Sequence, residues 1–176
     1  LGCYGDGGML FTENEGIADK VKSLRVHGKG KSKYDIDLVG LNSRLDTIQA
    51  AILLAKLEEF DWEVKRRNII AKKYSEELDG IINIPFIPEN INSIWAQYTL
   101  KHEDRKTIQD QLSLKGIPTM VYYPKPMHLQ NAYKKYNRGC MKNSEKLCEE
   151  VFSIPIYPDM TLNDQEYIID NLLKIL

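Results

Sequence analysis

Apolar residues recur at helical spacing soon after the start of the chain. Ile17, Val21 and Leu24 lie on one helical face. Thr12 and Glu15 precede them with the three-residue spacing of a capping box, in which each side chain bonds the other's backbone N–H. The pattern predicts an amphipathic helix that begins near residue 12.

A second helical pattern is much longer. It runs from Leu45 through Trp62 to Leu78, and Gly80 ends it. This length exceeds the roughly 20 residues of most globular helices. We therefore expect a bend near residues 60–61, or a helix that bridges two domains.

After residue 80 the pattern becomes mixed, with β-rich stretches between short helical ones. The predicted strands are residues 94–100 and 117–123, the predicted helices are residues 104–114, 143–152 and 164–176, and residues 81–87 and 154–158 are expected to be extended. Thr161 and Asp164 resemble a capping box for the last helix. Residues 79–176 are therefore expected to form a compact α+β domain.

The chain opens with the glycine-rich segment LGCYGDGGMLFT. Glycines at positions 2, 5, 7 and 8 surround Asp6, which indicates a tight backbone turn leading into a strand at residues 9–11. The segment has no Walker lysine and no GxGxxG pattern, so only its glycine count resembles a phosphate-binding loop. Chains seldom begin at such a turn, so we expect a fragment whose chemical partner residues lie upstream.

Composition narrows the class of protein. The chain has 176 residues, of which 43% are hydrophobic and 28% charged, and its net charge is −1. These values fit a globular protein, and a net charge near zero predicts no strong electrostatic attraction to nucleic acid. No apolar run approaches the roughly 20 residues that span a bilayer, and no signal peptide is visible.

The three cysteines lack metal-binding and CxxC spacing. We expect ordinary buried thiols that stay reduced in the cytoplasm, and no metal site.

Three polar clusters are candidates for binding. Asn42, Ser43 and Arg44 stand where a loop enters the long helix, a position that suits an anion but also an ordinary capped helix with a surface arginine. The segment from Tyr122 to His128 reads YYPKPMH: either a rigid ligand-binding loop or a proline-rich connector with a structural histidine. Residues 27–33 form either a mobile lid for an anionic ligand or a solvated surface.

Four segments together resemble the DegT/DnrJ/EryC1/StrS family, the pyridoxal-phosphate sugar aminotransferases of fold type I. In family order they are GCYGDGGMLFT, LRVHG, GLNSRLDTIQAAILLAKL and GIPTMVYYPKPMHLQ. The resemblance implies an α/β fold, the C-terminal part of a fold type I aminotransferase. Residues 1–78 would be the remainder of the large cofactor-binding domain with a long interdomain helix, and residues 79–176 the small α+β C-terminal domain.

The resemblance also implies roles for individual residues. The lysine that forms the Schiff base with pyridoxal 5'-phosphate is expected just upstream of Leu1, so no catalytic residue is expected within the chain. Asn42 would reach the cofactor phosphate across a dimer. The remaining matches are Arg44, Tyr122, Tyr123 and His128 for the substrate, and Gly5, Asp6 and Gly7 for the active-site turn. Relatives often have histidine where this chain has Tyr122, which puts an imidazole role there in doubt.

The implied activity of the full-length protein is amino transfer, usually from glutamate, to a keto-sugar nucleotide such as a UDP-linked 3-keto sugar. Such reactions serve cell-surface polysaccharide or antibiotic sugar biosynthesis, in a homodimer with a shared active site. The chain alone is expected to be inactive. Two alternatives stay open: a dehydratase of the same family, in which histidine replaces the lysine, and a non-catalytic binding or assembly module.

Overall fold

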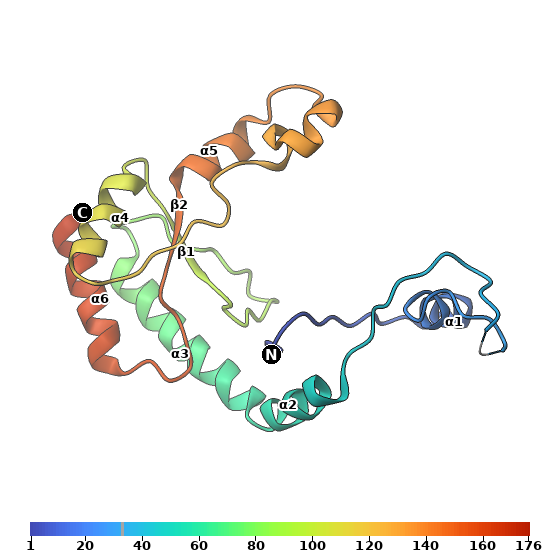
Figure 1. Cartoon of the computed structure of the whole chain (residues 1–176). Coiled ribbons are helices and arrows are strands. Elements are labelled where there is room, and N and C mark those ends of the chain that lie inside the picture. Colours follow the sequence, from blue (N-terminus) through green and yellow to red (C-terminus); the bar gives the residue numbers. More distant parts are fainter. Residues whose placement is uncertain (33) are drawn as a thin grey trace. The chain divides into compact units, whose positions relative to one another are not determined.

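The computed structural model describes residues 1–32 and 34–176 (Figure 1). Lys33, the last residue of the third polar cluster, lies outside the described residues. Packing divides the chain into two compact units, Leu1–Asp61 and Trp62–Leu176. The sequence places a domain boundary after residue 78, whereas this packing division falls earlier, because residues 70–78 bury their apolar side chains with residues that follow them.

The first helix of the first unit is α1 (Glu15–Leu24). Its predicted existence is confirmed, but its predicted cap is wrong. Asn14 Oδ1 accepts a hydrogen bond from the backbone N–H of Ile17 at 3.0 Å, so Asn14 is the N-cap. Thr12 Oγ1 accepts from the N–H of Asn14 instead, which orients the capping residue from outside the helix.

The strand predicted at residues 9–11 is absent. Met9 is 74% exposed and Phe11 88% exposed, and the segment has no regular structure. A strand exists only when a neighbour pairs with its backbone, and the described part of the chain supplies no such neighbour here.

The segment that follows α1 folds back against the end of that helix. Val26 and Asn42 form an antiparallel bridge, and the N–H of Ser43 donates to the carbonyl of Arg25 at 2.9 Å. Gly28 has φ +74°, and a Cβ there would overlap the carbonyl facing it. These backbone contacts hold residues 42–44 beside the end of α1.

The long helical pattern is interrupted once. α2 (Thr47–Glu58) and α3 (Phe60–Leu78) are separated by Glu59. This interruption lies next to residues 60–61, where the sequence predicts a bend. It divides one apolar pattern into two helices of ordinary length.

The sheet of the second unit has two antiparallel strands, β1 (Tyr98–Lys101) and β2 (Val151–Ile154) (Figure 1). Tyr98 pairs with Ile154, and Leu100 pairs with Phe152. All four of these side chains are buried, so one face of the small sheet meets the core.

The sequence located these strands only in part. β1 occupies the end of the predicted strand 94–100, but residues 117–123 contribute only an isolated bridge between Met120 and Ser153. Phe152, predicted in a helix, lies in β2. The apolar pattern around Phe152 fits either a helix or a strand. Pairing with a strand about fifty residues earlier decides for the strand.

The remaining helices agree more closely with the predictions. They are α4 (Arg105–Leu114), α5 (Lys142–Glu150) and α6 (Leu162–Ile175), with short 3₁₀ helices η1 (Met127–Leu129) and η2 (Asn131–Tyr136). Gly116, at φ +71°, follows the end of α4 as expected.

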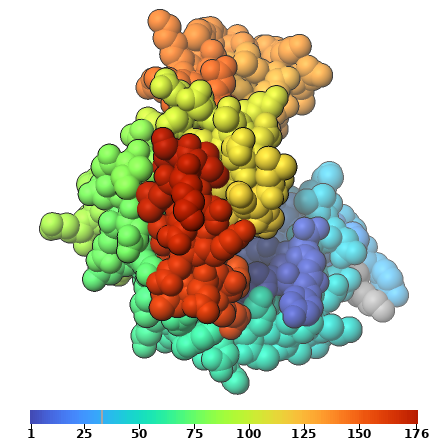
Figure 2. All heavy atoms as spheres, turned by 90° about the vertical axis from the view of Figure 1, so that its left-hand side faces the viewer, coloured from blue at the N-terminus to red at the C-terminus, as the bar shows by residue number. Residues whose placement is uncertain are grey.

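A single apolar core unites α3, α4, α6 and the sheet. Figure 2 shows α6 in red, with α3 in green on one side and α4 in yellow on the other. The core side chains are Ile70, Ala71, Tyr74, Leu78, Ile82, Tyr98, Leu100, Ile108, Leu112, Ile117, Phe152, Ile154, Met160, Ile168, Ile169 and Leu172. A buried hydrogen bond adds to this core: Gln165 Nε2 donates to the carbonyl of Ile70 at 2.7 Å.

The predicted cap of the last helix is confirmed and gives a test of local stability. Thr161 Oγ1 accepts from the N–H of Asp164 at 3.1 Å. Thr161→Ala should lower the free energy of unfolding by about 1 kcal/mol because an N–H of the first turn loses its partner. Urea titration measures this change, and Thr161→Ser, which keeps the hydroxyl, should restore most of it. Equal stability of Thr161→Ala and the wild type would contradict a stabilising cap.

Candidate functional site

The glycine-rich turn at the start of the chain is held by side chains of α2. Gln49 Oε1 accepts from the N–H of Tyr4, and Lys56 Nζ donates to the carbonyl of Gly2, both at 2.8 Å. Gly5 has φ +119°, a conformation that glycine adopts readily. The sequence patterns do not mark Gln49 or Lys56, since their partners in the turn lie about fifty residues earlier in the chain.

A cavity of about 340 Å³ lies between this turn and the segment that precedes α2. Its lining residues are Asp6, Gly7, Gly8, Asn42, Ser43, Arg44 and Leu45. Two predicted clusters, far apart in the sequence, therefore meet at one cavity. Gly5 shapes the turn but does not line the cavity.

The cavity combines donors suited to an anion with one acidic group. Arg44 Nε donates to Asn42 Oδ1 at 3.1 Å, so the amide keeps its NH₂ group as a donor. The terminal nitrogens of Arg44 form no hydrogen bond with any described residue, and a guanidinium fork suits phosphate or carboxylate. Asp6 supplies an acceptor for a donor group of the ligand. These residues fit a ligand that carries both a phosphate and polar N–H or O–H groups.

A second cavity, of about 540 Å³, lies in the second unit. Its lining residues are Tyr123, Pro124, Lys125, Pro126, Met127, His128, Gln130, Met141, Ser144 and Cys148. Tyr123 is 72% exposed, and its ring meets that of Tyr122 edge-on, with centroids 5.8 Å apart. Tyr122 does not line the cavity. The segment from Tyr123 to His128 therefore borders a cavity, and its role as a ligand-binding loop stays a prediction.

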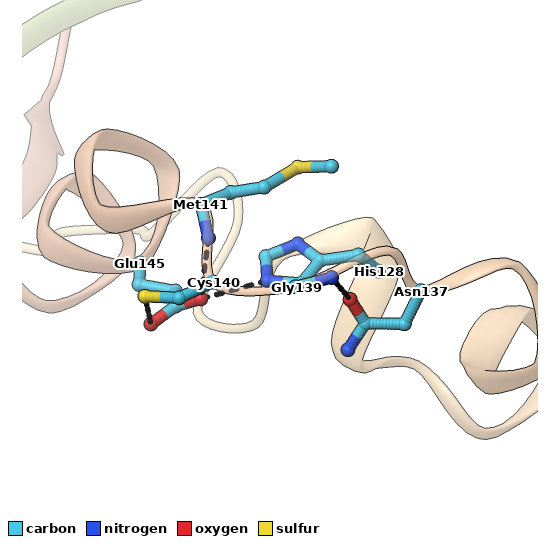
Figure 3. Close-up of polar contacts among 6 residues, drawn as sticks. All are labelled: His128, Asn137, Gly139, Cys140, Met141 and Glu145. Carbon is cyan, nitrogen blue, oxygen red and sulfur yellow. Dashed lines mark hydrogen bonds and ion pairs between the residues drawn. The ribbon is translucent and has the colours of Figure 1, made fainter.

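His128, on η1, is only 8% exposed and is bound to a carboxylate of α5 (Figure 3). Glu145 Oε1 lies 2.8 Å from His128 Nε2 and accepts from the N–H of Met141 at 2.9 Å, while Oε2 accepts from Cys140 Sγ at 3.4 Å. These hydrogen bonds, that to His128 foremost, lower the pKa of the Glu145 carboxyl. The hydrogen bond that the Cys140 thiol donates to Glu145 raises the pKa of that thiol.

The cysteines depart from expectation in one respect. Cys140 is exposed, and Cys3 and Cys148 are half-buried, so the prediction of three buried thiols is wrong. The Cys140 side chain donates to the half-buried Glu145 carboxylate and is not part of the apolar core.

The lowered pKa of Glu145 predicts a pH dependence of stability. A carboxyl whose pKa is lower in the folded state stabilises the fold above its unfolded pKa, about 4.3, and loses that effect as pH falls through the folded pKa. Glu145→Gln should therefore be less stable than wild type at neutral pH, with a difference that shrinks below about pH 4. Urea midpoints measured between neutral and acidic pH test this. Glu149→Gln, on an exposed part of the same helix, should retain the wild-type profile.

Within each unit, the structure groups the predicted residues. Asp6, Gly7, Asn42 and Arg44 surround one cavity, and Tyr123 and His128 line the other, with Glu145 beside it. Glu145 is not among the predicted site residues, although an acidic residue in the first turn of the predicted helix 143–152 is a signal of helix capping.

Two features are absent from the described residues. They contain no group of three or more His, Cys, Asp or Glu side chains placed to hold a metal ion. Nor do residues 1–32 and 34–176 include a helix with the length and apolar character needed to cross a membrane.

Comparisons with known proteins agree on one family. The sequence model of the DegT/DnrJ/EryC1/StrS aminotransferase family matches residues 1–173. The chain is 40% identical over 159 residues to the UDP-2-acetamido-2-deoxy-3-oxo-D-glucuronate aminotransferase of Pseudomonas aeruginosa, covering 90% of this chain and 44% of that protein. It is 36% identical to a pleiotropic regulatory protein of Geobacillus stearothermophilus, covering 99% and 48%.

Solved structures give the same result. The chain resembles a DegT DnrJ EryC1 StrS aminotransferase from Brucella abortus with TM-score 0.95 and 44% identity, covering 99% of this chain and 47% of that one. For DesV of S. venezuelae the TM-score is 0.93 at 32% identity, covering 99% and 48%. The chain thus spans about half the length of its relatives and has the fold of the C-terminal portion of fold type I sugar aminotransferases. The chain belongs to the DegT/DnrJ/EryC1/StrS aminotransferase family.

Proposed function

We propose that the protein containing this chain is a pyridoxal-phosphate-dependent aminotransferase that moves an amino group, from glutamate, to a keto-sugar nucleotide. One observation carries the proposal: in a member of this family, Asp6 and Gly7 meet Asn42 and Arg44 around a single cavity. The substrate class we propose is a UDP-linked 3-keto sugar, since a relative at 40% identity is named for one.

Asn42 and the glycine-rich turn are the parts of the chain proposed to hold the cofactor. When bound, pyridoxal phosphate supplies an electron sink for the carbon that gains or loses the amino group. The NH₂ group of Asn42, left available by the bond from Arg44 Nε, would donate to the cofactor phosphate of a partner subunit. Gly7 would let the backbone approach the ligand closely, Gly5 would shape the turn, and the hydrogen bond from Tyr4 to Gln49 would keep the turn in place.

Arg44 is proposed to bind the nucleotide sugar. Its guanidinium would pair in a bidentate manner with an anionic oxygen pair of the diphosphate or of a sugar carboxylate. Asp6 would accept a hydrogen bond from the ligand. These groups orient the substrate and leave the covalent chemistry to the cofactor.

The second unit is proposed to supply further contacts with the sugar. Tyr122 and Tyr123 carry phenol groups that can donate and accept hydrogen bonds, and His128 adds a ring nitrogen. At position 122 a phenol would therefore bind substrate where relatives often have an imidazole.

A homodimer follows from the proposed role of Asn42, which would serve the partner's site. The described chain leaves apolar side chains of α2 exposed, among them Ile48 and Leu54, as expected of a helix that packs in an assembly. Its three cysteines are free, which suits a cytoplasmic protein.

The test uses the protein expressed from its complete reading frame. It should bind pyridoxal phosphate and transfer nitrogen from ¹⁵N-labelled glutamate to a UDP-3-keto sugar, as detected by mass spectrometry of the product. A product that has lost a hydroxyl group without gaining nitrogen would indicate the dehydratase instead. A protein that binds no pyridoxal phosphate would contradict both reactions and favour a non-catalytic module.

A further inference from the structure

We infer that Glu145 is a positioning residue: it fixes the hydrogen on Nε2 of His128, so that Nδ1 faces a nucleotide-sugar ligand as a hydrogen-bond acceptor. The ligand would occupy the cavity of about 540 Å³ that His128 lines. The ligand's identity rests on the proposed function, whereas the state of the ring follows from contacts within the second unit.

The contacts of Glu145 determine which nitrogen carries the hydrogen. Its carboxylate accepts hydrogen bonds from the N–H of Met141 and the thiol of Cys140. An ionised carboxylate has only acceptors to offer, and its lowered pKa keeps it ionised. The 2.8 Å contact with His128 Nε2 is therefore a hydrogen bond that the ring donates.

Because Nε2 of His128 is bound to Glu145, Nδ1 is the ring nitrogen that remains for a ligand. The ring is 8% exposed, and Figure 3 shows Nδ1 turned away from the Glu145 carboxylate. In a neutral imidazole with hydrogen on Nε2, Nδ1 carries a lone pair and acts as an acceptor. Sugar hydroxyl and amide N–H groups are the donors that it would recognise.

Helix capping alone does not account for this arrangement. A cap at the start of α5 requires only the bond between Glu145 and the N–H of Met141. The same oxygen also binds a buried ring seventeen residues earlier in the chain, on η1. Glu145 thus joins η1 to α5, both of which contribute residues to the cavity lining, and orients the ring at the same time.

The first experiment reads the ring directly, by NMR of the complete enzyme labelled with ¹⁵N-histidine at pH 8.5, where imidazoles are generally neutral. The signal of His128 is the one that disappears in His128→Gln, and His27→Gln and His102→Gln identify those of the other two histidines of residues 1–176. Wild-type His128 should show a protonated Nε2 and an unprotonated Nδ1. In Glu145→Gln the amide can also donate, so the form with hydrogen on Nδ1 should become populated, whereas Glu149→Gln should match wild type. A wild-type ring protonated on Nδ1, or no change in Glu145→Gln, would overturn the inference.

The second experiment tests the ligand. Saturating UDP-N-acetylglucosamine should shift the Nδ1 signal of wild-type His128, and an active enzyme without that shift would contradict the assignment of the ligand.

In Glu145→Gln, KM for the nucleotide sugar should rise about tenfold, while amino transfer from glutamate to the cofactor, without nucleotide sugar, keeps its wild-type rate. Equal loss in both half-reactions would indicate a merely structural role. If wild type transfers no nitrogen, the proposed function fails, yet the ring measurement still decides the role of Glu145.

Discussion

Arg44→Ala is expected to lower kcat/KM for the nucleotide sugar by about a hundredfold. The guanidinium has two kinds of contact to lose: its bond to Asn42 Oδ1 at 3.1 Å and its proposed bidentate pairing with the substrate anion. A charge-assisted bidentate contact is worth roughly 1.5–3 kcal/mol, and each 1.4 kcal/mol changes affinity tenfold. Steady-state kinetics with varied nucleotide sugar and fixed glutamate measure the change.

Two further variants sharpen this result. Arg44→Lys keeps the positive charge but not the planar fork, so its kcat/KM should fall between those of wild type and Arg44→Ala. Arg138→Ala removes an exposed arginine of the second unit that lines neither cavity, and it should behave as wild type. Unchanged kinetics in Arg44→Ala would show that this side chain does not bind the substrate.

Tyr98→Ala should destabilise the second unit by about 3–5 kcal/mol. Tyr98 is fully buried on β1, and its ring lies 5.1 Å from that of Tyr74 and 5.4 Å from that of Trp95, centroid to centroid. Its hydroxyl shares a 2.9 Å hydrogen bond with Ser75 Oγ. Removing the ring leaves a cavity among α3, β1 and the Trp95 segment, where the surrounding side chains collapse only in part.

Tryptophan fluorescence during urea unfolding follows this change, since Trp95 contacts the altered ring. A Trp62→Phe background removes the other tryptophan of residues 1–176. Tyr98→Phe is the matched control: it keeps the ring and loses only the hydroxyl, so it should cost about 1 kcal/mol. A midpoint for Tyr98→Ala equal to that of Tyr98→Phe would contradict a role of the ring in the core.

The candidate site was predictable where its residues carry a motif, and not where a side chain acts from a distance. Asn42 and Arg44 stand together in one segment, and their type and position at a helix start made them candidates for anion binding, with an ordinary capped helix as the alternative. Gln49 and Lys56 support the glycine-rich turn from 45 and 54 residues away. Such partners leave no local pattern in the sequence, so only the folded chain identifies them.

The sequence by itself determined the features that depend on neighbours within a few residues. These include the cap at Thr161, the end of α4 before Gly116 and the interruption of the long helix at Glu59. Tertiary structure decided what depends on contact between distant segments. Phe152 is in a strand because Leu100 lies opposite it, residues 9–11 form none because no described segment pairs with them, and the opening glycines meet Asn42 and Arg44 only in the folded chain. Helix signals are local because their hydrogen bonds span four residues, whereas strands and binding sites require partners that the chain brings together only on folding.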